Sequence, residues 1–126
     1  MVSACKPASP YSDMSDDDLH TRATALSLPD RYALYVDVLR SELPPRPILA
    51  SDVASMGEPA WTYTMARATG GSVQDLSDAM PVLWAFDRRC TPLELDRLRR
   101  HIKTIGFEAA ADRINTLCGS GLPVGD

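Results

Sequence analysis

Apolar residues recur every three or four positions over much of the chain, which is the spacing of an amphipathic α-helix. Residues 73–84 have the same spacing, but this segment contains Pro81, which removes a backbone hydrogen bond. We therefore expect a kink, or two short helices, near Met80. These patterns predict an all-α fold, a compact bundle or a set of stacked hairpins of about five short helices. The most regular stretches are residues 28–43, 95–105 and 107–118.

Signals for helix ends agree with this pattern. A capping box pairs a Ser or Thr at the helix start with an acidic residue three positions later. The clearest box is Thr91 with Glu94, because Pro92 between them occupies a position where no amide is needed. Gly106 follows the apolar stripe at 95–105 and is a predicted left-handed C-cap. Three more pairs fit the same spacing: Ser15 with Asp18, Ser27 with Asp30, and Ser72 with Asp75.

The segment from 51 to 69 is less regular. It begins as a helix, is interrupted by Gly57 and Pro59, and then alternates large residues with threonines at 61–65. That alternation is typical of a strand. No second alternating run is present to pair with it, and an unpaired strand leaves backbone groups unsatisfied. We therefore prefer a helix from Pro59 to Ala68.

The chain of 126 residues has the size of one domain. Residues 1–14 and 119–126 lack periodicity and are rich in Pro, Ser or Gly, so we predict disordered tails around a single helical domain at 15–118. The proline-rich stretch at 43–47 is either a ligand for an aromatic-lined groove or, as we expect, a rigid connector between two helices.

The composition bears on the cellular compartment. The longest apolar run, residues 79–86, is far shorter than the roughly 20 residues of a membrane-spanning helix. The N-terminus as given carries no apolar run typical of a secretory signal. The three cysteines are an odd number and widely spaced, which is untypical of a disulfide scaffold and fits a reducing compartment. We therefore expect a cytoplasmic location without a membrane span, with Cys118 in the core.

No set of residues indicates catalysis or a cofactor. The chain has two histidines, and Cys90 and His101 fit no zinc spacing. Glycines at 70–71 precede a helix start but lack a P-loop lysine. We therefore expect no enzyme, no metal and no cofactor, and no small-molecule ligand is evident. A small enzyme with its site at His101 or His20 remains an alternative.

The charge is unevenly distributed. The chain has a net charge of −4, yet residues 88–103 hold six basic residues against two acidic ones. A helix on each side of Gly106 makes helix-turn-helix nucleic-acid binding an alternative function. In that register, however, Asp112 and Asn115 fall where apolar core residues belong. Binding to phosphates would also have to offset the net negative charge, so we expect no nucleic-acid partner.

The remaining hypothesis is a non-catalytic helical protein-interaction module, such as an adaptor, an inhibitor or an antagonist of a larger protein. It would bind a protein partner or a second copy of itself. Aromatic and arginine side chains commonly anchor such interfaces. The aromatics would serve equally well as core residues, and both interpretations stay open at this point. The candidate partner-binding residues are Trp61, Trp84, Phe86, Arg97 and Arg100.

Overall fold

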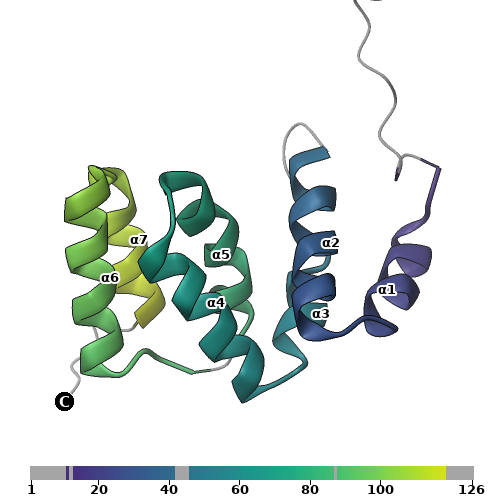
Figure 1. Cartoon of the computed structure of the whole chain (residues 1–126), viewed down its shortest axis with the longest axis horizontal. Coiled ribbons are helices and arrows are strands. Elements are labelled where there is room, and N and C mark those ends of the chain that lie inside the picture. The colour runs from purple at the N-terminus through teal and green to yellow at the C-terminus, as the bar shows by residue number, and fades with distance from the viewer. Residues whose placement is uncertain (1–10, 12, 42–45, 87, 119–126) are drawn as a thin grey trace, which may run out of the picture. The chain divides into compact units, whose positions relative to one another are not determined.

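A computed structural model of the chain describes residues 11, 13–41, 46–86 and 88–118. Over these residues the chain forms seven α-helices and one 3-10 turn, with no strand, so the all-α prediction is confirmed (Figure 1). None of the helices among the described residues is long and apolar enough to cross a membrane. The elements are α1 (Asp16–Thr24), α2 (Leu28–Ser41), α3 (Ala50–Ala54), α4 (Glu58–Gly70), α5 (Val73–Ala85), α6 (Pro92–Ile105), η1 (Glu108–Ala110) and α7 (Ala111–Cys118).

The helices group into two compact units, Met1–Val53 and Ala54–Asp126, and each is described by itself. The single domain expected from 15 to 118 stays a prediction. The predicted tails fall almost wholly outside the described residues, as does most of the proline-rich connector at 43–47.

The N-terminal unit is built from α1, α2 and α3. Its core includes Tyr32 and Tyr35, whose rings meet edge to face with centroids 5.5 Å apart. The buried Arg31 side chain links all three helices of this unit. Its guanidinium donates to the carbonyl of Thr24, the last residue of α1, at 2.9 Å, to that of Leu26 just after α1 at 3.1 Å, and to that of Asp52 in α3 at 3.0 Å. One cation thus satisfies three backbone acceptors that the helix ends leave free.

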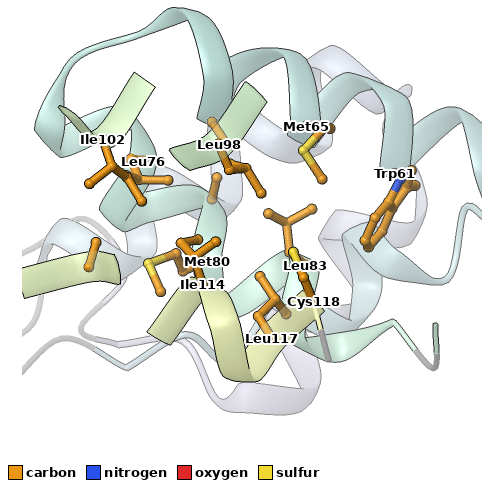
Figure 2. Close-up of a cluster of buried hydrophobic side chains, with 13 residues drawn as sticks. Trp61, Met65, Leu76, Met80, Leu83, Leu98, Ile102, Ile114, Leu117 and Cys118 are labelled. Carbon is orange, nitrogen blue, oxygen red and sulfur yellow. The ribbon is translucent and has the colours of Figure 1, made fainter. Parts of the chain in front are cut away.

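The C-terminal unit packs α4, α5, α6 and α7 around one apolar core. Side chains from all four helices converge there, as Figure 2 shows. The segment at 61–65 is helical, as preferred, and the strand alternative is wrong. Helical spacing explains the outcome, because positions i, i+3, i+4 and i+7 share one face. The residues of α4 on that face are Trp61, Thr64, Met65 and Ala68, all buried.

The predicted helix ends are largely confirmed. Capping boxes form at Ser15, Ser72 and Thr91, each with the acidic residue three positions later. Gly106 ends α6 in the left-handed conformation, with φ at 75°. Ser27 differs, since its hydroxyl donates to the Asp30 carboxylate at 3.4 Å.

We expected a kink or two short helices near Met80. Helix α5 continues through Pro81, so the two short helices are wrong, whereas the kink stays a prediction. Proline removes the amide that would bond to the carbonyl four residues earlier, that of Ser77. Ser77 and Pro81 both line an open depression on the partly exposed side of α5. The opposite face of α5 buries Leu76, Ala79 and Leu83 completely. This burial stabilises the helix against the missing hydrogen bond.

Cys90 and Cys118 form a disulfide across 28 residues of sequence. The cysteine count, untypical of a disulfide scaffold, did not predict this pair, although Cys118 is buried in the core as expected. The hairpin geometry explains the pairing. Helix α6 starts just after Cys90, the chain turns at Gly106, and α7 returns to end at Cys118, so the two cysteines lie at the same end of the hairpin.

Candidate interaction surface

Two of the aromatic residues singled out by the sequence belong to the core region rather than to the surface. Trp61 is 1% exposed, and Phe86 is half-buried against it with ring centroids 5.2 Å apart, edge to face. The Trp61 indole nitrogen donates to a Glu94 carboxylate oxygen at 2.8 Å. Both rings therefore hold the segment before α6 against α4, and neither enters the surface proposed below.

Arg88 completes this cluster. Its guanidinium lies over the Trp61 ring, 4.2 Å from the centroid, which is a cation–π contact. It also donates to Glu58 at 2.6 Å and lies 3.6 Å from Glu94. A basic residue that the sequence assigned to a charged patch is thus engaged within the C-terminal unit.

Trp84 has the opposite environment. It lies one residue before the end of α5 and is 53% exposed. Beside it is an open depression of about 350 Å³, which we call the Trp84 surface. Three of its five lining residues are apolar. Four of the five belong to α5, and the other, Arg113, belongs to α7. The lining residues are Ser77, Met80, Pro81, Trp84 and Arg113.

The spacing along α5 explains why this face is apolar. Ser77, Met80 and Trp84 are related by three and four residues, so they share one side of the helix. Val73, four residues before Ser77, extends the same line and is 40% exposed. Met80 is itself buried in the core, so the floor of the depression is continuous with the hydrophobic interior. Apolar surface left open in this way marks candidate interaction sites.

The arginines of the basic stretch do not act as one free patch. Arg99 donates to the Asn115 side chain at 2.7 and 3.2 Å, joining α6 to α7. Arg100 is paired with Asp96 one turn earlier. Hydrogen bonding and attraction from Asp96 raise the pKa of Arg100 above its ordinary value. Arg97 is exposed and makes no polar contact with the other described residues.

A second open depression, of about 440 Å³, lies between α4 and α6, and we call it the Arg97 depression. It brings together the two arginines that the sequence named as candidates. His101 on its wall donates from Nε2 to the Gly71 carbonyl at 2.6 Å, because a carbonyl oxygen can only accept. The lining residues are Thr69, Arg97, Arg100, His101 and Thr104.

Each histidine has a polar partner within its own unit. His20 Nδ1 lies 2.5 Å from a carboxylate oxygen of Asp52. His101 is bonded to a backbone carbonyl. Within the described parts of the chain, no group of three His, Cys, Asp or Glu residues could hold a metal ion. In the turn after the glycines at 70–71, the backbone amide of Ser72 donates to the Asp75 carboxylate at 2.9 Å, so this amide already has an acceptor within the chain.

The hairpin of α6 and α7 resembles a helix-turn-helix only in outline. Ile114 and Leu117 are the buried positions of α7, while Asp112 is exposed and Asn115 is bonded to Arg99. The exposed part of α7 presents one acidic and one basic residue, Asp112 and Arg113, so its charges offset each other and form no row of cations for phosphates.

The C-terminal unit is thus a small helical domain with an exposed tryptophan beside an apolar depression, and a separate arginine-lined depression. No protein-family model, curated protein or solved structure matches the chain.

Proposed function

We propose that the chain is a protein-interaction module that binds an apolar segment of a protein partner at the Trp84 surface. The observation that carries this proposal is the exposure of Trp84 beside a depression whose floor is Met80 of the core. Tryptophan is enriched among the residues that dominate binding energy at protein interfaces. Trp84 is also the one candidate aromatic that the core leaves available among the described residues.

The energy available at this surface is large enough to matter. A tryptophan side chain offers up to about 250 Å² of contact area. Roughly half of that is open at Trp84, so covering it contributes about 3 kcal/mol at 25 cal/mol per Å². This is about a hundredfold in affinity.

Arg113 indicates the chemistry of the partner. It lines the edge of the depression and makes no hydrogen bond or ion pair with other described residues. A partner segment with apolar side chains flanked by a carboxylate would cover Trp84 and neutralise Arg113 together. An amphipathic helix or a second copy of this chain could supply such a segment.

The cytoplasmic location expected from the cysteine count stays a prediction. The disulfide between Cys90 and Cys118 weighs against it, because such bonds persist mainly in oxidising compartments.

The test compares Trp84→Ala with a matched control, Leu93→Ala. Leu93 is 56% exposed and lies outside the Trp84 surface, so both changes remove an exposed apolar side chain. Sedimentation of each variant measures self-association, and immobilised full-length chain measures retention of proteins from cells of its source. We expect Trp84→Ala and Arg113→Glu to abolish the association that the wild type and Leu93→Ala retain.

Circular dichroism of each variant separates lost binding from lost folding. Equal association of the Trp84 and Leu93 variants, or a wild-type chain that is monomeric and retains nothing, would refute the proposal.

A further inference from the structure

We propose that the Arg97 depression binds a phosphoryl group, carried by a phosphomonoester. This site is independent of the Trp84 surface, since the two share no lining residue. The uncommitted hydrogen-bond donors of the depression, and the charge of the groups that carry them, define the ligand.

Helical spacing gathers on one face the four side chains that α6 contributes to the depression. Arg97, Arg100, His101 and Thr104 occupy positions i, i+3, i+4 and i+7 of α6, which lie on one face. The opposite face of α6 buries Leu98 and Ile102 in the core. Packing of α6 therefore fixes which way the cationic face points.

The two threonines do not compete for the ligand as donors. Thr69 donates its hydroxyl proton to the Met65 carbonyl at 2.8 Å, and Thr104 donates to that of Arg100 at 2.9 Å. Their hydroxyl protons are thus used within their own helices. They form the wall of the depression, and ligand recognition falls to the cations.

Arg97 is the principal ligand-binding group. Its guanidinium has five donors and no polar partner among the described residues. Arg100 uses Nε and one terminal nitrogen for Asp96, which leaves its other terminal nitrogen uncommitted. Asp96 cancels the charge of Arg100, so the net positive charge at the site rests on Arg97.

His101 supports the site by position. Its bond to the Gly71 carbonyl ties α6 to the turn between α4 and α5 and fixes the ring beside the arginines. The uncommitted donors of the depression therefore belong to guanidinium groups. The fitting ligand presents acceptor oxygens and negative charge, and the planar arginine fork matches a phosphoryl group in two-point contact.

A phosphomonoester fits better than a nucleic-acid backbone. A backbone needs positive charge along its whole path. Next to the Arg97 depression, α6 carries the acidic residue Asp96. The neighbouring basic residues Arg88 and Arg99 are bonded to Glu58 and Asn115, so they do not extend the positive charge of the depression into a path. A single phosphoryl group requires only the local arginines, and a depression of about 440 Å³ has room for it with the group that carries it.

The test titrates the full chain with inorganic phosphate and with O-phosphoserine, following backbone amide resonances by NMR. We expect shifts centred on Arg97 and Arg100 and tighter binding of the ester than of free phosphate. Arg97→Ala should weaken binding about tenfold, the scale of one charge-assisted contact. Arg89→Ala is the matched control, because Arg89 is an exposed arginine outside the depression and should have no effect.

Three outcomes would overturn the proposal. The first is no saturable binding of either probe. The second is equal weakening by Arg97→Ala and Arg89→Ala, which indicates general charge attraction. The third is that a single-stranded oligonucleotide binds more tightly than O-phosphoserine does, with the same loss of affinity in Arg97→Ala and in Arg89→Ala. Trp84→Ala should leave phosphate binding unchanged, which separates this proposal from the interaction surface.

Discussion

The bond between Cys90 and Cys118 should supply a large part of the stability of the C-terminal unit. A cross-link restricts the unfolded chain, and its effect grows with the length of the loop it closes. For the sequence separation of 28 between these cysteines, the chain-entropy model gives a loss of about 12 cal/mol/K, or about 3.5 kcal/mol at room temperature. Small domains have a total free energy of unfolding of about 5–15 kcal/mol, so reduction should be plainly visible.

The measurement is guanidinium unfolding of the full chain with and without reductant. Both tryptophans, Trp61 and Trp84, belong to the C-terminal unit, so their fluorescence reports on that unit alone. We expect reduction to lower the free energy of unfolding by about 3 kcal/mol. Reductant should have no effect on Cys90→Ala, whereas Cys5→Ala should respond as the wild type does.

A thiol count checks the same reasoning by chemistry. The oxidised chain should show one reactive thiol after denaturation, from Cys5, and three after reduction. Three free thiols in chain that was kept under oxidising conditions would refute the pairing. An unfolding free energy unchanged by reductant would refute the argument from loop closure, even if the bond is present.

Two predictions concern the N-terminal unit. Arg31→Ala should lower the free energy of unfolding by about 3 kcal/mol, because three backbone carbonyls in a buried site lose their hydrogen-bond donor. The control is Arg22→Ala, on the exposed side of α1, which should lower it by less than about 0.5 kcal/mol in the same denaturation experiment. Burial, with the negative charge and hydrogen bond of Asp37, raises the pKa of Tyr11 above its usual 10.0. The protonated phenol therefore stabilises the fold below pH 10, and this contribution is lost as the pH rises through the folded-state pKa. Asp37→Asn should lower the pKa of Tyr11, measured from phenolate absorbance with Tyr11→Phe subtracted, and an unchanged titration would contradict the assignment.

Local signals of the sequence predicted the helices well. The capping boxes at Ser72 and Thr91 and the glycine cap at Gly106 depend on neighbours within four residues, so the sequence contains all the information they need. The apolar stripe of α7 was equally predictable. The two short helices considered at Pro81 did not form, because the local penalty of proline is offset by burial of α5, which only the tertiary structure supplies.

The disulfide and the fate of the aromatics were not predictable from local signals. Cys90 and Cys118 are far apart in sequence, and their pairing depends on how the α6–α7 hairpin folds back. One signal was available: each cysteine lies about one helix away from the turn at Gly106. Trp61 and Trp84 are likewise indistinguishable by residue type. Only packing decides that the first is buried against Phe86 and the second is exposed.

The position of Trp84 in α5 explains why its exposure indicates function more than folding. Leu76, Ala79 and Leu83 already fill the core side of this helix, so the core does not require another large side chain. An exposed tryptophan adds apolar surface that water disfavours and that a destabilised chain could aggregate through. Alanine at this position should therefore leave the fold intact and remove only association. The same reasoning applies to Arg97, whose charge no described polar contact neutralises, so we propose that the Trp84 surface and the Arg97 depression each bind a partner from outside the fold.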